Sequence, residues 1–431
     1  MKRILSITLT IMLLGISMPT FGRAIDTAKG AAAKGATTSE PPSTVVTTHL
    51  DLVDPDDGEI SLREAMLYAM DDPTLDDLIT FNIPATLPLT IVLNAPLPTL
   101  NGDTLSIDGL NLGSDGGRVC LSGDDQYQLF RLESQSSLTL SHLELVHGLA
   151  SDGMGGAIYC QGAALTVDHC RLAYNRVLVA NATTATSCYG GAIYASGNVD
   201  LSLQNTLLDS NMALVAEGAC VGSYSYGGAI ALSQAAHVAL TNCRLEGNEA
   251  AYGGSIFAQA SGSASGSTLH IGRCCFWGNS ASVHGGAMKT TSVQYWVHGC
   301  TFGGNMATMG GALHLSGSLY RTPSVTSCTF VSNGSLSSYG GSAIRVDGQQ
   351  TALQLCNNLF VRSTPLSLAR DVDAPGNTTL QSWGDIISVT NYMANGEQSG
   401  IMLEQADVNG DGQVGIGDII SIANNMASKG N

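Results

Sequence analysis

The sequence predicts a mainly β protein: a right-handed parallel β-helix of about nine coils, with an N-terminal cap and a small α-helical module at the C-terminal end. Two observations predict this fold. An eleven-residue pattern, Φ-x-Φ-x-x-C-x-Φ-x-x-N with Φ a large apolar residue, recurs along the chain, and a Gly-Gly pair separates most copies. A fixed motif with variable spacing is typical of stacked repeats whose loops differ in length.

Nine copies of the pattern are present. Clear copies occupy 165–175, 201–211, 238–248, 269–279, 295–305 and 323–333, and looser copies begin at Leu105, Leu138 and Leu353. The Gly-Gly pairs begin at Gly155, Gly190, Gly227, Gly253, Gly285, Gly310 and Gly340.

The alternation inside the motif predicts strands rather than helices. Φ-x-Φ alternates with a period of two, the phase then slips by one residue, and C-x-Φ alternates again, as two short strands around a corner require. An apolar residue after each Gly-Gly marks a third strand. Three strands per coil, stacked at roughly 4.8 Å, give a parallel β-helix. The recurrent Asn suits a left-handed turn position, from which it can form a ladder with its copies.

Composition restricts the partners. Charged residues are only 12% of the 431 residues, 51 residues are glycine, and the net charge is −17. This acidity argues against nucleic acid and anionic membrane surfaces as partners.

The N-terminus predicts export. Lys2 and Arg3 precede an apolar run, Ile4 to Ile16, and small residues follow, so residues 1–24 are typical of a signal peptide. The run is too short for a membrane span, so we expect a secreted or cell-surface protein with no span after signal removal. Residues 25–45 have the composition of a flexible linker.

Residues 46–100 have the features of a cap, ahead of a β-helix over 101–365. Ser61 and Glu64 form a capping box at the start of a short helix to about Met70, and apolar strands follow at 78–83 and 89–93. A covering element at the solenoid end shields strands that would otherwise be unpaired.

The cysteines predict a buried column of thiols rather than a disulfide framework. They alternate with apolar residues at one motif position, which Thr206 completes, and stacked neighbours are poorly oriented for bonding. The column contains Cys170, Cys243, Cys274, Cys300 and Cys328. Cys188 and Cys220 lie in long inserts, and their disulfide state is left open.

Residues 366–431 contain a calcium-loop pattern. Loop positions 1, 3, 5 and 12 carry oxygen ligands, Gly410 stands before position 5 and Gly412 at position 6, and the residue at position 7 supplies its backbone carbonyl. The predicted ligands of this structural Ca²⁺ are Asp407, Asn409, Asp411, Gln413 and Asp418. Gly417 to Ser421 repeats Gly384 to Ser388, but the earlier loop lacks the ligand core.

Three segments resemble known families. The Gly-Gly-Ala-Ile units followed by Cys/Thr-x-Phe/Leu-x-x-Asn resemble the repeats of polymorphic outer membrane proteins and related bacterial β-helix surface proteins. Ile60 to Ala65 resembles the N-terminal domain named for Cys-Ser-Leu-Arg-Glu-Ala, with Ile60 replacing the cysteine. The duplicated loop-helix unit resembles a type I dockerin, which implies docking to a cohesin domain.

Catalytic residues are not assigned. The carbohydrate-cleaving β-helix enzymes need a base or paired carboxylates. The candidates for such groups are Asp168, His169, Arg171, His147, His284 and His298, but no recurring carboxylate pair is present. The residue before Gly-Gly forms a possible aromatic strip for sugar rings, made of Tyr189, Tyr226, Tyr252 and Tyr339, with His284 and Met309 at the same position.

These observations predict a secreted bacterial β-helix protein that acts as a non-catalytic adhesion or binding component, attached through a calcium-dependent tail. Two alternatives remain open. One is a polysaccharide lyase or glycoside hydrolase delivered by the same tail, which clusters of carboxylates or arginines on adjacent coils would favour. The other is a structural spacer, which a bare surface would favour.

Overall fold

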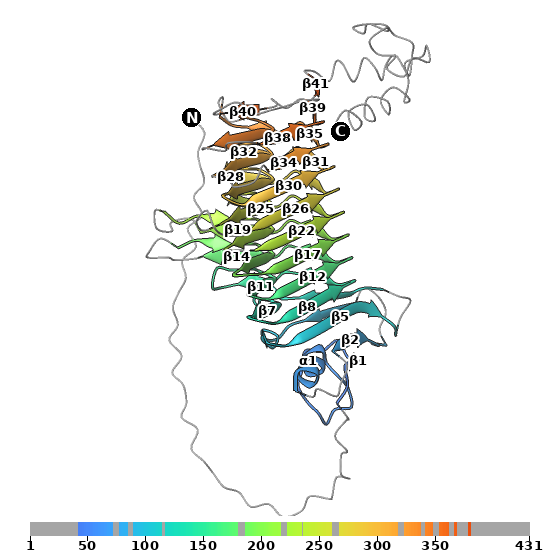
Figure 1. The fold of residues 1–431 in the computed structure, drawn as a ribbon. Helices are drawn as coiled ribbons and strands as arrows, with labels where there is room; N and C mark the ends of the chain where they lie inside the picture. Colours follow the sequence, from blue (N-terminus) through green and yellow to red (C-terminus); the bar gives the residue numbers. More distant parts are fainter. Residues whose placement is uncertain are drawn as a thin grey trace, which may run out of the picture. The chain divides into compact units, whose positions relative to one another are not determined.

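The chain forms an all-parallel β solenoid, the arrangement of a parallel β-helix (Figure 1). The computed structural model describes residues 42–71, 77–84, 89–113, 117–179, 186–216, 222–234, 236–260, 267–317, 323–337, 341–347, 353–361, 366–368 and 378–380. Coils contribute strands to four sheets, numbered 1 to 4 in chain order within a coil, and neighbouring strands pair in parallel.

Sheets 1 and 2 carry the two halves of the repeated motif. Sheet 1 is formed by β1 (Val45–Val46), β2 (Leu78–Phe81), β5 (Thr104–Asn111), β8 (Ser137–Ser141), β12 (Ala164–Asp168), β17 (Asp200–Gln204), β22 (His237–Thr241), β26 (Thr268–Gly272), β30 (Gln294–His298), β34 (Ser324–Thr326) and β38 (Gln354–Cys356). Sheet 2 is formed by β3 (Leu89–Val92), β6 (Val119–Ser122), β9 (Glu144–Val146), β13 (Arg171–Ala173), β18 (Leu207–Asp209), β23 (Arg244–Glu246), β27 (Cys275–Trp277), β31 (Thr301–Gly303), β35 (Thr329–Val331), β39 (Leu359–Val361) and β41 (Thr378–Leu380).

Sheets 3 and 4 complete each coil. Sheet 3 is formed by β10 (Leu149–Ala150), β14 (Arg176–Val179), β15 (Cys188–Tyr189), β19 (Met212–Val215), β20 (Ser225–Tyr226), β24 (Glu249–Tyr252), β28 (Ser280–His284), β32 (Met306–Met309) and β36 (Gly334–Ser335). Sheet 4 is formed by β4 (Leu100–Asn101), β7 (Phe130–Glu133), β11 (Ile158–Gln161), β16 (Ile193–Ser196), β21 (Ile230–Ser233), β25 (Ile256–Gln259), β29 (Met288–Thr291), β33 (Leu313–Ser316), β37 (Ile344–Asp347) and β40 (Leu366–Leu368).

The repeats are confirmed, but the number of strands per coil is not. The nine motif copies correspond to the sheet 1 strands from β5 to β38. The prediction of three strands per coil is wrong, because sheet 3 supplies a fourth. Its inward residues are mostly small, such as Ala213, Ala250 and Ala281, so their alternation gives little hydrophobic signal. The hand of the coil stays a prediction.

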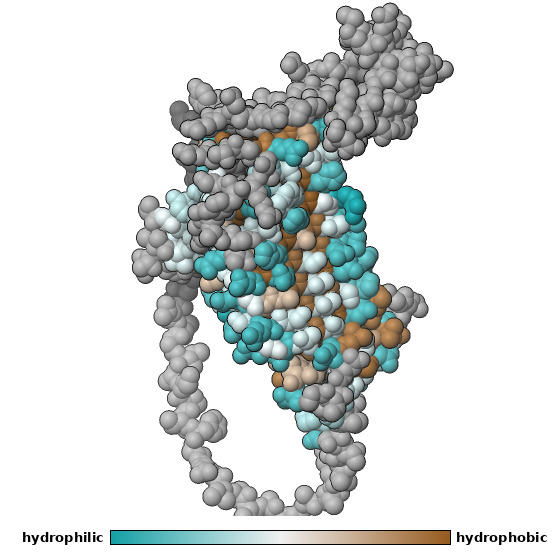
Figure 2. Space-filling model, viewed as in Figure 1, coloured by the Kyte–Doolittle hydropathy of each residue, from teal (hydrophilic) through white to brown (hydrophobic). Residues whose placement is uncertain are grey.

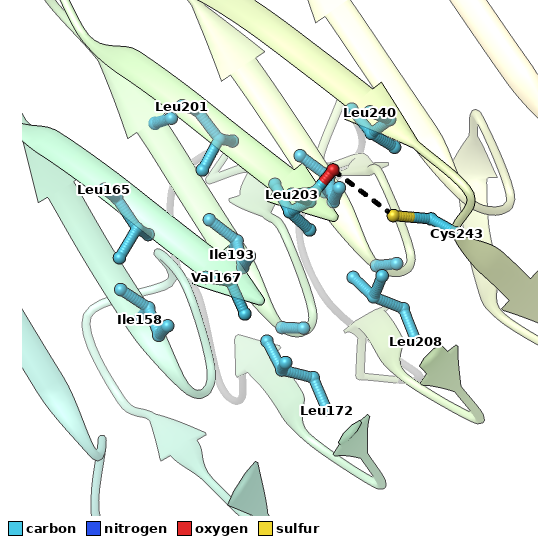
Figure 3. Close-up of a cluster of buried hydrophobic side chains, with 14 of the residues drawn as sticks. Ile158, Leu165, Val167, Leu172, Ile193, Leu201, Leu203, Leu208, Leu240 and Cys243 are labelled. Atoms are coloured by element: carbon cyan, nitrogen blue, oxygen red, sulfur yellow. Dashed lines mark hydrogen bonds between the residues drawn. The ribbon is translucent and has the colours of Figure 1, made fainter. Parts of the chain in front are cut away.

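A continuous apolar core fills the solenoid. Leucine, isoleucine and valine from sheets 1, 2 and 4 meet in the middle of each coil, as Figure 3 shows for residues between Ile158 and Cys243. On sheet 2, Phe276, Phe302, Phe330 and Phe360 stack with ring centroids 4.8, 4.9 and 5.0 Å apart. Each coil therefore buries its apolar face only because neighbouring coils cover it.

Buried asparagines form a ladder along the corner between sheets 2 and 3. From Asn175 to Asn305, each side-chain amide donates to the side-chain oxygen of the next asparagine, as Asn248 does to Asn279 at 2.9 Å. Each also donates to a main-chain carbonyl one coil back, at 3.0 Å from Asn248 Nδ2 to Leu208 O. The ladder contains Asn175, Asn211, Asn248, Asn279, Asn305 and Asn333. The predicted ladder is confirmed. The left-handed backbone conformation, however, is adopted by the residue that precedes each asparagine, such as Tyr174 before Asn175 or Ser210 before Asn211.

The predicted column of buried cysteines is also confirmed, and it has a hydrogen-bonding role. The thiol of Cys274 donates to Gly272 O at 3.3 Å and accepts the main-chain N–H of Cys243 at 3.4 Å. Thr206 and Asn358 make the equivalent contacts to Cys170 N and Cys328 N, at 3.3 and 2.9 Å. This position therefore selects a small side chain with a polar γ or δ atom, which Cys, Thr and Asn all provide.

The Gly-Gly pair serves two purposes. Gly190 has φ of +67°, a left-handed conformation that other residues rarely adopt. A Cβ on Gly191 would lie 2.1 Å from Gly228 O on the next coil, so this position excludes any side chain.

The predicted helix at the N-terminal end is present as α1 (Leu62–Asp71). Ser61 and Glu64 exchange the two capping-box hydrogen bonds, at 2.9 and 3.1 Å. Arg63 pairs with Asp51 at 2.7 Å and donates to Pro96 O at 2.6 Å, which fixes the helix to the first coils. Buried side chains of α1 join the solenoid core. No helix within the described residues has the length and apolarity needed to cross a membrane.

We expect Asn248→Ala to lower the free energy of unfolding by about 3 kcal/mol or more. The substitution leaves three buried groups without partners: the main-chain N–H and side-chain amide of Asn211, and the carbonyl oxygen of Leu208. Urea unfolding followed by circular dichroism measures this. Gln204→Ala, at an exposed position of β17, is the control and should change stability by less than about 0.5 kcal/mol. Equal effects of the two substitutions would contradict a structural role for the ladder.

Candidate binding faces

The predicted tyrosine strip is a stacked column on sheet 3. The rings of Tyr189 and Tyr226 lie 5.0 Å apart, and those of Tyr226 and Tyr252 lie 5.2 Å apart, with interplanar angles of 12° and 19°. His284 continues the column edge-on to Tyr252, at 5.4 Å. Tyr339 lies outside the described residues.

Because the rings stack on one another, the faces of the inner tyrosines are already occupied. Tyr226 also contacts Phe257 of sheet 4, at a centroid distance of 4.6 Å. A sugar ring needs the open face of an aromatic ring, where its C–H groups meet the negative π surface. The column is therefore a poor platform for sugars, and its geometry is that of a structural ladder over the Gly-Gly corner.

A shallow groove on the outward face of sheet 1 is a better binding surface. Its volume is about 310 Å³. Small side chains from three successive strands, Thr166, Ser202 and Ala239, stand in register along its floor. Asp200 and His237 line one side with polar groups. Figure 2 shows near-neutral side chains over these strands and hydrophilic ones along the corner with sheet 2.

One end of the groove carries a stacked pair of aromatic rings. His270, which lines the groove, stacks on Trp296 of the next coil at a centroid distance of 4.4 Å and an angle of 12°. On the other side of Trp296 the register neighbour is Ser324, which is small. Among the described residues, therefore, no aromatic ring covers the second face of this partly exposed indole.

Two predicted catalytic candidates, Asp168 and His169, lie at the corner between sheets 1 and 2. Asp168 accepts hydrogen bonds from His169 Nδ1 and Asn205 Nδ2, each at 2.9 Å. Burial disfavours ionisation of Asp168, but the bonds from Asn205 and His169 outweigh it and lower the pKa of the carboxyl. His169 has φ of +51° and stacks on His142 at 5.4 Å, so both candidates have partners that explain their positions.

Arg171 and His147 are also held in local pairs. Arg171 lies between Glu144 and Asp209 of the adjacent coils, with nitrogen–oxygen distances of 3.6 and 2.9 Å. His147 pairs with Asp125 at 3.3 Å. Asp168, His169 and Arg171 follow one another around one corner, with Arg171 and its partners on sheet 2, whereas His147 lies beyond β9 at the next corner. Each of these candidates is engaged by its own neighbours.

The last two candidates lie further along the solenoid. His298 is exposed and its Nδ1 lies 3.1 Å from Thr326 Oγ1. His284 stacks flat on His314 of sheet 4, at 4.3 Å and 5°. His314 in turn contacts Asp347 through Nε2 at 2.9 Å. His314 and its neighbours were not among the candidates predicted from the sequence. They become visible when the outward positions that follow each Gly-Gly-x-Φ are aligned between coils.

Several predicted residues lie outside the described part of the chain. These are Cys220 and the calcium ligands Asp407, Asn409, Asp411, Gln413 and Asp418. Within the described residues, no cluster of three or more His, Cys, Asp or Glu side chains has the geometry to hold a metal ion. Cys188 is a buried free thiol that donates to Leu214 O at 3.2 Å.

Comparison with known proteins gives no relative. No protein-family model, no curated protein and no solved structure matches the chain.

We expect the tyrosine column to make stability sensitive to alkaline pH. Burial, together with the nearby Tyr189 and Tyr252, raises the pKa of Tyr226 to about 12. In the unfolded chain a tyrosine ionises near pH ~10. Between these values only the unfolded phenol loses its proton, so stability falls as pH rises through this window.

Tyr226→Phe should therefore become more stable relative to the parent protein as pH rises from about 10 to about 11, as measured by urea unfolding at each pH. Tyr224→Phe, at an exposed position, is the control and should follow the parent. If the parent and Tyr226→Phe lose stability in parallel, the phenol of Tyr226 is not the responsible group.

Proposed function

We propose that the protein is an exported polysaccharide-binding β-helix that holds an extended glycan chain along sheet 1. The observation that carries this proposal is the groove with small residues on its floor and, at its end, the indole of Trp296, whose second face is covered by no aromatic ring among the described residues. The groove follows the stacking direction of the coils, so a linear polymer meets equivalent positions on successive strands.

The chemistry of the groove suits a hydroxyl-rich ligand. Ser202, Thr166 and Asp200 offer hydroxyl and carboxylate groups that exchange hydrogen bonds with sugar hydroxyls. The indole face of Trp296 provides the apolar contact that a pyranose ring needs. The net charge of −17 disfavours a polyanionic nucleic acid in the same place.

The resemblance to polymorphic outer membrane protein repeats supports a bacterial surface setting, as does the signal-like segment 1–24. In the solenoid the resembling positions have physical roles: Gly-Gly forms the crowded corner, and Asn forms the ladder. In the Cys-Ser-Leu-Arg-Glu-Ala-like segment, Leu62 is buried, Arg63 pairs with Asp51 and Glu64 caps α1. These roles support a capping function for the segment 46–100.

Attachment is proposed to occur through the dockerin-like segment 366–431. Its second loop offers only oxygen donors, in the number and spacing that Ca²⁺ prefers. Asp407, Asn409, Asp411 and Asp418 would bind through side chains and Gln413 through its main-chain carbonyl. The ion would supply structural order, and a cohesin-type domain is the proposed partner. In the enzyme alternative the coil surface would cleave its ligand as well as bind it. In the spacer alternative the coil surface would bind no ligand.

We expect Trp296→Ala to weaken binding of the preferred polysaccharide by up to about tenfold, because one aromatic contact is worth about 0.5–1.5 kcal/mol. The measurement is titration calorimetry of the full chain against cello-oligosaccharides, xylan and homogalacturonan. Trp277→Ala is the matched control, since this indole is 51% exposed on sheet 2, away from the groove. Binding that is equally sensitive to both substitutions would place the ligand elsewhere, and no binding to any glycan would refute the proposal.

For the tail, we expect the full chain to take up calcium and Asp407→Ala or Asp418→Ala to abolish that uptake at the second loop. Four oxygen-bearing side chains crowded into one loop need a cation to be held together. Calorimetric titration with CaCl₂ tests this. Asp57→Ala, in an exposed acidic turn, is the control and should bind as the parent does. A parent protein that takes up no calcium at millimolar concentration would end the docking proposal.

A further inference from the structure

The last coils carry a polar grid on the outward face of sheet 4. Residues two apart on a strand point to the same side, and the parallel register aligns them across coils. One row of the grid is Lys289, His314 and Arg345, and the adjacent row is Thr291, Ser316 and Asp347. The equivalent first row on earlier coils contains mainly aromatic residues, such as Tyr159, Tyr194 and Phe257.

Lys289 and Ser316 are in direct contact within this grid. Lys289 Nζ donates to Ser316 Oγ at 2.6 Å and to the carbonyl oxygen of Thr290 at 3.2 Å, and the Ser316 hydroxyl donates to the same carbonyl oxygen at 3.0 Å. The lysine is only 6% exposed, whereas Ser316 is partly exposed. Within the part of the chain that the structure describes, no carboxylate lies in ion-pair range of Lys289. A buried amine therefore stands behind an accessible hydroxyl.

The surroundings of Lys289 make its charged form less stable than that of an exposed lysine. Burial lowers the pKa of the amine to about 8, and the negative charge of Asp347 only partly opposes this. The other ionisable groups facing it are His284, His314 and Arg345. Asp347 is engaged by Arg345 Nε at 2.6 Å and by His314 Nε2 at 2.9 Å. Burial and the nearby positive charge of Lys289 lower the pKa of His314 to about 3, so it adds no charge.

We propose that Ser316 and Lys289 form the nucleophile and general base of a hydrolytic site for small O-acyl esters, such as acyl groups carried on sugar hydroxyls. Once Lys289 has lost a proton, the Ser316 hydroxyl can turn from Thr290 O to the amine at the same contact, and the amine then takes the hydroxyl proton as Oγ attacks. The proposed reaction does not depend on binding in the sheet 1 groove.

The chemistry balances with water as the only co-reactant. Lys289 Nζ takes the Ser316 proton while Oγ bonds to the acyl carbon. The bond from that carbon to the alcohol oxygen breaks, and the ammonium returns the proton to the departing alkoxide. Lys289 then takes a proton from water as the water oxygen bonds to the acyl carbon of the acyl-serine. The bond from that carbon to Ser316 Oγ breaks, the ammonium returns its proton to Oγ, and the carboxylic acid leaves.

The solenoid supplies internal controls for this site. Ser196 and Ser233 occupy the same outward row as Ser316 on earlier coils. On the preceding strand, where Ser316 has Lys289, Ser196 has Tyr159 and Ser233 has Tyr194. Ser233 is partly exposed, as Ser316 is, and has a tyrosine in place of the amine, so it is the matched control, whereas Ser196 is buried.

The test is covalent labelling of the full chain with a fluorophosphonate probe at pH 8, followed by peptide mapping, with 4-nitrophenyl acetate hydrolysis as a second readout. We expect an adduct on Ser316 and none on Ser196 or Ser233. Ser316→Ala should remove the adduct, and Lys289→Met should slow labelling and hydrolysis about 100-fold or more. Ser233→Ala should leave both unchanged.

The pH dependence keeps the proposal testable if Lys289→Met does not fold, as judged by circular dichroism. Below the pKa of about 8 the ammonium cannot accept a proton, so the labelling rate of the parent protein should rise about tenfold per pH unit until it levels above that value. A rate that is flat between pH 6.5 and 8, no Ser316 adduct, or a folded Lys289→Met that labels at the parent rate would each overturn the proposal.

Discussion

The hydrogen bonds that side chains make from one coil to the next are the constraint on which the solenoid depends. Asn248 holds the coil ahead through Asn279 Oδ1 and the coil behind through Leu208 O, and the buried thiol of Cys274 makes a similar link between coils. A buried amide without these partners would cost about 1–3 kcal/mol for each unpaired group. In the coils from Asn175 to Asn333 the links therefore fix the register of the strands, and with it the positions of the outward side chains.

This register turns the surface into straight rows, and each row is suited to a different task. In the tyrosine column both faces of Tyr226 are covered by its neighbours, so this row is better suited to stabilise the Gly-Gly corner than to hold a ligand. On sheet 1 small residues leave a groove, and the row of His270 and Trp296 ends at the small Ser324. A ligand surface thus arises where a row changes from large to small side chains.

The sequence was sufficient for the features that repeat with a strong hydrophobic contrast. Nine motif copies, the buried cysteines, the asparagine ladder and the capping box at Ser61 were all predictable, because each repeats or follows a local rule. Sheet 3 was not, since its inward alanines give little contrast. The contact between Lys289 and Ser316 was also missed, because it joins residues on two coils whose register only the structure fixes. Trp296 likewise gains its open face only from the neighbours above and below it.

The change along the first outward row of sheet 4 is the feature that packing alone does not explain. Tyr159, Tyr194 and Phe257 place rings in this row, with Ala231 between the last two, and a ring at position 289 would lie next to Phe257. The chain instead buries an ammonium there with only a hydroxyl and a carbonyl oxygen as partners. Removing a charge from water without a paired carboxylate is costly, and well-packed apolar residues at such positions are often at least as stable. Buried ionisable groups with strongly shifted pKa values cluster at functional sites. For this reason the grid around Lys289, rather than the exposed ion pairs elsewhere, is the place where we infer a reaction.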